Sequence, residues 1–335
     1  MIPRTIPTWQ SKSWQEELSN LITDPTELFS LLKLDSSLLP SAIASAQLFP
    51  LRSTHAFVNR IETGNIDDPL LRQILPLAAE QGIDADYSLD PLEEAEFTPI
   101  PGLIHKYTGR VLLVAANQCA INCRYCFRRH FDYQANSPSR EQWNDAFRYI
   151  QGNTSIDEVI LSGGDPLAIS DKQLSWMITQ IESIPHVSRL RIHSRLPIVA
   201  PSRVTDTLIE SLRSTRLSTV MVIHCNHSQE IDNEVCDALK KLKTSDCTLL
   251  NQSVLLRGVN DSEKALTDLS LTLFRQGVLP YYLHLLDKVT GTSHFNVELG
   301  CARSLYQALL ANLPGYLVPK LVKETPNAPS KVPII

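Results

Sequence analysis

Hydrophobic positions recur at two different periods along the chain, and the change of period divides it into parts. Through residue 76, apolar side chains return every three or four positions, which is typical of short amphipathic helices. The acidic stretch 86–99 lacks this period and is predicted to be a linker. The helices are expected at residues 13–22, 26–34, 38–47 and 54–61, and residues 68–76 are expected to form a turn, one helical segment and a proline stop.

From residue 110 onward, short apolar runs alternate with amphipathic stretches of helical length. This alternation predicts a parallel sheet with right-handed crossovers, and six units rather than eight indicate an α/β fold of the open, partial (β/α)6 TIM type. The strands are expected at 111–116, 158–161, 190–193, 219–224, 248–256 and 279–286. The helices are expected at 140–151, 171–184, 202–214, 230–244, 263–276 and 297–312.

The tail after Pro314 contains several further prolines and is predicted to be irregular. The chain is therefore divided into an N-terminal helical region (1–95), a partial barrel (96–313) and a C-terminal loop (314–335).

Composition changes this picture little. Of 335 residues, 43% are hydrophobic and 20% are charged, which is an ordinary globular balance. The net charge of -5 gives no basic footprint for nucleic acid. No apolar run approaches the ~18 residues that a membrane span needs. Seven cysteines without a disulfide-like framework fit a reducing cytoplasm, where we expect the protein.

Three of those cysteines lie on one predicted loop. Cys119, Cys123 and Cys126 have the spacing C-x-x-x-C-x-x-C and directly follow the first strand of the barrel. Three thiolates can bind three irons of a cubane iron–sulfur cluster and leave the fourth iron open to another ligand. A zinc knuckle is the alternative, but it would need a fourth ligand at regular spacing, and His130 fits that position poorly.

Two further strand ends carry candidate binding residues. The second strand ends in Ser162-Gly163-Gly164-Asp165, and paired glycines let a backbone approach a ligand closely. A plain tight turn explains the glycines equally well. Ser194 and Arg195, at the end of the third strand, are weaker candidates for the same ligand.

The cysteine spacing, with Tyr125 before the third cysteine, resembles the signature of radical S-adenosylmethionine (SAM) enzymes. Further stretches resemble the lysine 2,3-aminomutases within that family, and the resemblance covers most of residues 100–335. They are 128–131, 224–227, 251–261 and 280–282, with Asp287 and residues 294–295 following.

The resemblance implies a 4Fe-4S cluster on the three cysteines, SAM on its open iron, and pyridoxal 5′-phosphate (PLP). One electron then splits SAM to give a 5′-deoxyadenosyl radical. The glycine turn resembles the motif that hydrogen-bonds the amino group of SAM, with Asp165 as its acidic residue. The residues expected to contact SAM are Tyr125, Ser162, Gly163, Gly164, Asp165, Ser194 and Arg195.

The family's PLP-binding lysine is matched by Lys331, which follows the pattern at 318–326. Asn-Ala-Pro-Ser stands where the family usually has a glycine-rich run. Near the first strand, three residues match positions around the PLP phosphate, and they are Lys106, Tyr107 and Arg110.

Three charged residues match the family's substrate-binding positions. Arg128 corresponds to the arginine that binds the α-carboxylate of lysine. Asp287 and Glu324 correspond to the acidic pair that holds the ε-ammonium group, although the second is usually Asp. These roles follow from the resemblance.

The implied activity is that of an isomerase. The radical removes a hydrogen atom from the β-carbon of L-lysine, and the amino group moves from Cα to Cβ. A short chain with the segment at 48–52 resembles the aminomutases that supply (R)-β-lysine to a separate ligase for elongation factor P. A reductant such as flavodoxin is also implied. Ser262 stands where fermentative relatives have a zinc-binding cysteine, so no structural zinc is expected.

Three alternatives stay open. The same chemistry could act on another amino acid, such as glutamate or arginine, although Asp287 and Glu324 favour a cationic side chain. The chain could be a radical SAM enzyme without PLP, for instance one that modifies RNA. It could also be a non-catalytic iron–sulfur protein.

Overall fold

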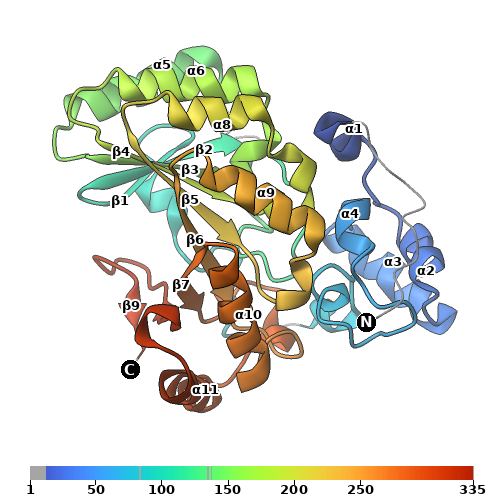
Figure 1. The fold of residues 1–335 in the computed structure, drawn as a ribbon. Coiled ribbons are helices and arrows are strands. Elements are labelled where there is room, and N and C mark those ends of the chain that lie inside the picture. The colour runs from blue at the N-terminus through green and yellow to red at the C-terminus, as the bar shows by residue number, and fades with distance from the viewer. Residues whose placement is uncertain (1–12, 83, 134–135, 137, 335) are drawn as a thin grey trace.

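A nine-stranded sheet whose strands follow chain order organises the structure, which is a computed structural model that describes residues 13–82, 84–133, 136 and 138–334 (Figure 1). Strands β2 to β8 run parallel, whereas β1 and β9 pair antiparallel at the two edges. The strands are β1 (Leu103–Tyr107), β2 (Arg110–Ala116), β3 (Glu158–Gly163), β4 (Arg189–Ser194), β5 (Ser218–His224), β6 (Thr248–Val254), β7 (Leu279–His284), β8 (Lys320–Lys323) and β9 (Val332–Pro333).

The helices between the strands cover one side of the sheet, and helices α1 to α4, which precede β1, lie together beside it (Figure 1). In the described ranges, none of them is both long enough and apolar enough to cross a membrane. They are α1 (Trp14–Ser19), α2 (Pro25–Leu32), α3 (Leu39–Leu48), α4 (His55–Val58), α5 (Arg140–Gly152), α6 (Asp171–Glu182), α7 (Leu196–Val199), α8 (Asp206–Arg213), α9 (Asn233–Lys243), α10 (Glu263–Arg275) and α11 (Leu299–Asn312). Short 3-10 turns used below are η2 (Leu71–Gln73), η3 (Ala78–Gln81), η4 (Glu94–Phe97) and η7 (Ser228–Glu230).

The predicted α/β architecture is confirmed, and all six expected strands are present. The tail differs from its prediction, because β8 extends the parallel sheet and β9 turns back on it. Prolines are tolerated there because Pro319 precedes β8 and Pro333 lies in an edge strand. In the stretch 68–76, the expected helical segment is present as the short 3-10 turn η2.

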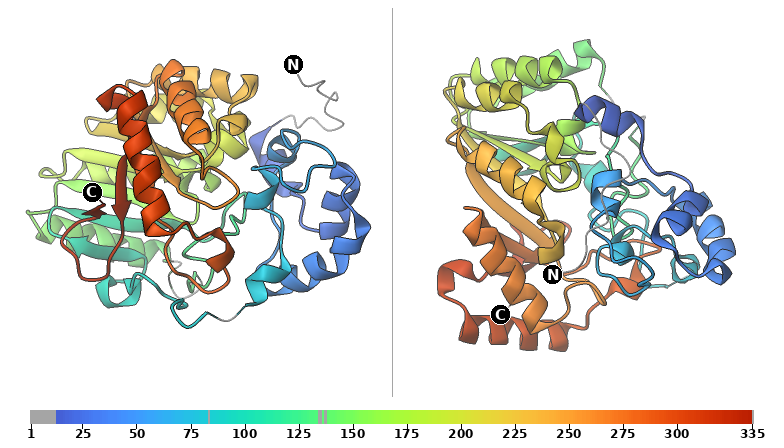
Figure 2. Two further views of the ribbon diagram at one scale, coloured as in Figure 1. Left: turned by 90° about the horizontal axis from the view of Figure 1, so that it is seen from below. Right: turned by 45° about the vertical axis from the view of Figure 1, so that its right-hand side comes forward.

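The N-terminal helices pack against the loops that follow β4 and β5 (Figure 2). Arg60 donates to the carbonyls of Ile198 (2.6 Å) and Glu230 (3.1 Å). One apolar core runs through both parts, since Phe57 of α4 and Leu161 of β3 belong to the same buried cluster. The helical region therefore forms part of the wall around the carboxyl ends of the strands.

The sheet is open, and side chains bridge its two edges. Tyr107 on β1 donates a hydrogen bond of 2.6 Å to Glu324, which directly follows β8. Lys106 Nζ lies 3.6 Å from the same carboxylate. The curled sheet thus brings its first strand beside its last parallel strand without pairing them.

Candidate active site

The cysteine loop begins where β2 ends and is held by the N-terminal region. The Asn122 amide donates to the carbonyl of Arg52, and the Arg124 amide donates to the carbonyl of Gln73, both at 2.9 Å. The Arg124 guanidinium forms two bonds with the buried carboxylate of Glu80, at 2.8 and 2.5 Å. Arg129 binds that carboxylate as well, at 2.8 Å. A buried carboxylate between two arginines fixes the loop from both sides.

The three loop thiols are free and half-buried. Burial raises the pKa of Cys119, and nearby Asp165, Cys126 and Cys123 raise it further, so the thiols lie close to one another. Burial also raises the pKa of Cys126, to about 11, while Arg128 and Arg129 oppose this shift. Among the described residues, no three Cys, His, Asp or Glu side chains are arranged around a single metal ion. Neighbouring thiols with arginines close by fit a multi-iron cluster, because each thiolate of such a cluster binds a different iron.

The glycine turn after β3 packs tightly against the start of the cysteine loop. A Cβ on Gly164 would lie 2.5 Å from the carbonyl oxygen of Gln118, and one on Gly163 would lie 2.6 Å from Val114. Gly163 also has a φ of 103°, which favours glycine. In the structure, these glycines allow the turn to meet the cysteine loop, whichever ligand binds there.

Asp165 joins the ends of β3 and β4. One carboxylate oxygen accepts from Ser194 Oγ at 2.6 Å, and the other accepts from the amides of Arg195 and Leu196 at 2.7 and 3.0 Å. The carboxylate is 6% exposed and fully engaged with the chain. Its expected contact with SAM stays a proposal, whereas the structure gives it a role in positioning Ser194 and Arg195.

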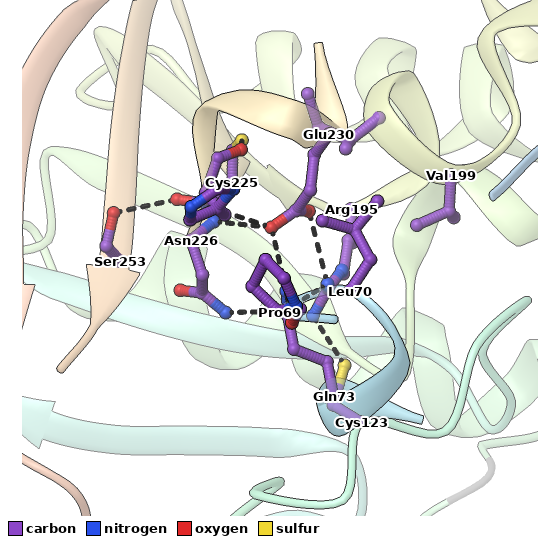
Figure 3. A network of polar contacts seen from close by, with 12 residues as sticks. Pro69, Leu70, Gln73, Cys123, Arg195, Val199, Cys225, Asn226, Glu230 and Ser253 are labelled. Carbon is purple, nitrogen blue, oxygen red and sulfur yellow. Dashed lines mark hydrogen bonds and ion pairs between the residues drawn. The ribbon is translucent and has the colours of Figure 1, made fainter. Parts of the chain in front are cut away.

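Arg195 extends from the end of β4 to the cysteine loop, where it meets a buried polar network (Figure 3). Its Nη1 lies 2.9 Å from Cys123 Sγ, and it also contacts the Tyr125 hydroxyl. Gln73, Asn226 and Glu230 complete the network. Four of the expected cofactor-binding residues (Cys123, Tyr125, Asp165 and Arg195) are therefore linked by direct contacts.

Arg128, the expected carboxylate-binding residue, forms a bidentate pair with Glu94 of η4. Its Nε and Nη2 donate to the two carboxylate oxygens at 2.8 and 2.6 Å. Its Nη1 faces the end of β3, 3.4 Å from Ser162 Oγ and 3.5 Å from the Gly163 carbonyl. Both Glu94 and Arg128 also line a cavity of about 350 Å³ beside the cysteine loop. One edge of the guanidinium is therefore occupied, and the other points to the carboxyl ends of the strands.

Lys331 lies just before β9 and donates to Glu324. Its Nζ is 5.8 Å from the centre of the Tyr282 ring on β7. Burial alone would raise the pKa of Glu324, but Lys331, Tyr107 and Lys106 hold it at about 2. Asn327 in the preceding turn has a φ of 60°, a conformation that the glycine-rich run of the family would adopt easily. The final hairpin thus holds Lys331 close to the three residues expected around the PLP phosphate.

Arg110 is the third of those residues, and its guanidinium carbon lies 4.4 Å from the centre of the Tyr107 ring. Tyr107 and Lys106 both contact Glu324. A chain of contacts therefore runs from Arg110 through Tyr107 and Glu324 to Lys331, and it joins the two ends of the barrel.

Buried polar groups inside the curl of the sheet face Lys331. Burial lowers the pKa of His284 to about 3, and the charge of Lys331 lowers it further. Burial also lowers the pKa of His193, with Lys331 again among the causes. Burial raises the pKa of Asp287 to about 7, although Lys331 opposes this shift. Nε2 of His193 and Nε2 of His284 are buried without a hydrogen-bond partner.

These observations fit a PLP site. Unpartnered imidazole nitrogens suit the polar ring substituents of the cofactor. Lys106 and Arg110 are cations that suit its phosphate, and Tyr282 offers an aromatic face beside the lysine.

Sequence reasoning did not identify the carboxylates and amides that hold the expected site residues. Glu80 lies between the predicted segments and Glu94 lies in the predicted acidic linker, and both are buried against arginines of the cysteine loop. Gln73 and Glu230 hold Arg195 in the same way. The one available signal was the group of arginines at 124, 128 and 129, since buried cations need acidic partners.

Comparisons with known proteins place this site in context. The sequence model of the Radical SAM superfamily matches residues 113–269. The L-lysine 2,3-aminomutase of Escherichia coli (strain K12) is 47% identical over 331 residues, which cover 98% of this chain and 96% of that protein. The enzyme of the same name from Haemophilus influenzae is 46% identical, with coverages of 99% and 98%. That of Clostridium subterminale is 33% identical, and the match covers 96% of this chain and 77% of that protein.

Proposed function

The chain belongs to the lysine 2,3-aminomutase family of radical SAM enzymes, and on that basis we propose that it converts L-lysine to (R)-β-lysine with PLP held on Lys331. Family membership makes it an isomerase and implies a 4Fe-4S cluster and SAM. The finer statements, namely PLP, the product and its use, are proposals.

One observation carries the PLP proposal. Lys331, four residues from the last residue of the sequence, lies among buried groups contributed by strands far away in the chain. Its charge lowers the pKa of His193 on β4 and of His284 on β7, after the larger effect of burial. Arg128, two residues after the third cysteine, acts on His193 as well. These effects support a shared polar interior for Lys331 and the cysteine loop, which an aminomutase requires.

When bound, the cluster with SAM supplies the one-electron chemistry that removes a hydrogen atom from lysine, and PLP supplies the carbonyl group that carries the migrating amine. Lys331 would hold PLP, and Lys106 and Arg110, which are joined to it through Glu324 and Tyr107, would hold the phosphate. Cys119, Cys123 and Cys126 hold three irons. SAM would be held by Tyr125 and by the residues at the ends of β3 and β4, which are Ser162, Gly163, Gly164, Asp165, Ser194 and Arg195.

The chain's own charges orient the substrate. Arg128 offers the edge of its guanidinium that Glu94 leaves open to the α-carboxylate of lysine. Asp287 and Glu324 offer carboxylates to the ε-ammonium group. A cation at one end and two carboxylates at the other select a diamino acid over glutamate, and they fix its length. The buried interior protects a reactive carbon radical from water.

We propose that the (R)-β-lysine is used by a ligase that modifies elongation factor P, with a flavodoxin-like protein as electron donor. The segment 48–52, on which the resemblance to that group of aminomutases depends, contacts the cysteine loop directly. Arg124 Nη1 donates to the Phe49 carbonyl at 2.7 Å, and both Arg124 and Arg129 stack on the Phe49 ring. This contact supports a role for the segment in the family's site, and the pathway itself needs its own test.

The test is an anaerobic assay of the reconstituted protein with dithionite, SAM, PLP and L-lysine, and chiral chromatography with mass spectrometry follows the product. We expect (R)-β-lysine, and we expect none when PLP or SAM is omitted. Cys126→Ala should abolish the product, whereas the matched control Cys247→Ala, in a cysteine remote from the loop in sequence, should not. If L-lysine gives no β-lysine, whereas L-arginine or L-glutamate in its place gives the corresponding β-amino acid, the substrate assignment is contradicted. Transfer of the product to elongation factor P by its ligase tests the pathway separately.

A further inference from the structure

The Arg195 guanidinium lies against a cysteine sulfur, and several buried polar groups hold it there. The residue is 4% exposed, and Nη1 lies 2.9 Å from Cys123 Sγ. Figure 3 shows the guanidinium between the Cys123 sulfur and the Glu230 carboxylate, with Gln73 beside it. Nη1 donates toward the sulfur, and Nη2 faces the network behind it.

Two acceptors from distant parts of the chain bind Nη2. Gln73 Oε1 of η2 accepts at 2.7 Å, and Glu230 Oε2 of η7 accepts at 3.2 Å. Glu230 is itself fixed, since its other oxygen accepts from the Asn226 and His227 amides at 2.9 and 3.0 Å and from Gln73 Nε2 at 3.1 Å. Gln73 is 0% exposed, and so is Glu230. The guanidinium is therefore clamped by two buried side chains from η2 and η7.

A hydrogen bond to a cluster thiolate raises the reduction potential, because the donor stabilises the additional negative charge of the reduced cluster more than the charge of the oxidised one. The effect is large where the surroundings are dry, since charges interact more strongly at low dielectric. A charged donor is stronger than a neutral one. Arg195 meets all three conditions at Cys123.

We propose that Gln73 and Glu230 are positioning residues that hold Arg195 as a hydrogen-bond donor to the Cys123 thiolate, and that this contact raises the reduction potential of the cluster. The inference rests on the proposed assignment of the cluster to Cys119, Cys123 and Cys126. It concerns the cluster before SAM binds, so any contact between Arg195 and SAM is a separate matter. The N-terminal region then contributes to the electron-accepting property of the barrel through Gln73.

The test is an anaerobic redox titration of the reconstituted full chain without SAM, followed by the electron paramagnetic resonance signal of the reduced cluster. Arg195→Gln should lower the midpoint potential, so that the ratio of reduced to oxidised cluster at a fixed solution potential falls at least tenfold, which corresponds to about 59 mV for one electron. Gln73→Leu changes no charge and should shift the potential in the same direction by a smaller amount. Arg195→Lys keeps a cationic donor and should lie between the wild type and Arg195→Gln.

Gln229→Leu is the matched control. Gln229 is a neighbouring glutamine of η7 that binds Asp68 at 2.7 Å and the Arg60 carbonyl at 3.0 Å, and it does not contact Arg195. The cluster of the Gln229→Leu variant should have the same midpoint potential as that of the wild type. If Arg195→Gln fails to assemble a cluster, Gln73→Leu decides, since it keeps Arg195 and all three cysteines and changes only a residue that positions the arginine.

Iron and sulfide content distinguishes a failure of the proposed function from a failure of the inference about Arg195. A wild-type chain that binds no cluster, or binds one undisturbed in the triple cysteine variant, would contradict the proposed function. Clusters with full iron content and unchanged potentials in both Gln73→Leu and Arg195→Gln would overturn the inference and leave the proposed function intact.

Discussion

Tyr107 on the edge strand β1 and Glu324, which directly follows the last parallel strand β8, are joined by a hydrogen bond of 2.6 Å. The same carboxylate accepts from Lys331, so the first strand of the barrel and the final lysine share one acceptor. Strand pairing does not close the sheet, and this contact substitutes for part of that closure. The position of Lys331 therefore depends on a residue more than two hundred positions earlier in the chain.

We expect Tyr107→Phe to loosen the final hairpin without unfolding the barrel. A hydrogen bond to a charged acceptor contributes about 1.5–3 kcal/mol, so amide hydrogen exchange in residues 320–334 should speed up roughly tenfold or more. Hydrogen-exchange mass spectrometry measures this directly. Tyr316→Phe, at a tyrosine that is 61% exposed, is the control and should leave exchange in the hairpin unchanged. Equal protection in Tyr107→Phe and wild type would show that the edge contact does not hold the hairpin.

Glu94→Gln should weaken lysine binding more than turnover. The glutamine keeps the size of the side chain but loses the charge that aligns Arg128 through two hydrogen bonds. We expect KM for lysine to rise about tenfold or more, because truncating a buried charge pair leaves the arginine poorly oriented. SAM cleavage in the absence of lysine should be unaffected. Glu96→Gln, an exposed neighbour on η4, should behave as wild type. A lowered kcat with KM unchanged would argue against this positioning role.

Lysine binding should depend on pH through Asp287. Burial raises the pKa of this carboxyl to about 7, so that it is neutral in the free protein at lower pH and ionised at higher pH. An ε-ammonium group needs the ionised form, so kcat/KM for lysine should rise as pH increases through about 7. Glu324, with a pKa of about 2, stays ionised over this range and cannot produce the change. Asp287→Asn should remove the rising limb and lower kcat/KM at pH 8 about tenfold or more.

The raised pKa of Asp287 also predicts how the stability of the protein changes with pH. The unfolded chain releases this proton near pH ~4, so between about pH 4 and 7 the native state holds more protons and loses stability as pH rises. Asp287→Asn should therefore raise the free energy of unfolding of the cofactor-free protein by more at pH 8 than at pH 5. Urea unfolding at the two pH values gives this difference, and a difference of opposite sign would contradict the raised pKa.

Glu80→Gln should destabilise the protein strongly. It removes the carboxylate that binds Arg124 and Arg129, all three side chains being 0–2% exposed, and it leaves two buried cations without a counter-charge. Breaking a buried pair in this way costs about 3–5 kcal/mol. Asp268→Asn, which breaks a surface pair with Lys264, should cost about 1 kcal/mol or less. Urea unfolding measures the free energy of unfolding of both variants. Similar losses of stability in the two would mean that Glu80 does not fix the cysteine loop.

The strand–helix part of the fold could be predicted because its signal is local. Apolar runs of strand length and amphipathic helices depend on neighbouring residues, and the six expected strands are all present. The strands β8 and β9 could not be predicted in this way, since Pro319 and Pro333 resemble loop residues and the pairing of β8 depends on β7. The cysteines and Lys331 could be named because a motif carries them.

The partners of the site residues could not be predicted, for a physical reason. Glu94 meets Arg128 thirty-four positions away, and Gln73 meets Arg195 at a separation of 122. Such contacts arise from tertiary packing, and in the sequence each of these residues resembles a solvated side chain. The roles of Asp165 and of the glycine turn were expected to involve a ligand, whereas the structure adds contacts within the chain that hold two strand ends together.

The most direct test of the whole account is chemical labelling of Lys331. The protein is loaded with PLP, reduced with borohydride, digested and analysed by peptide mass spectrometry. We predict that the pyridoxyl group is found on Lys331, that Lys331→Ala abolishes both this label and β-lysine formation, and that Lys320→Ala, an exposed lysine on β8, alters neither. A pyridoxyl label on another lysine, or β-lysine produced by Lys331→Ala, would contradict the central claim.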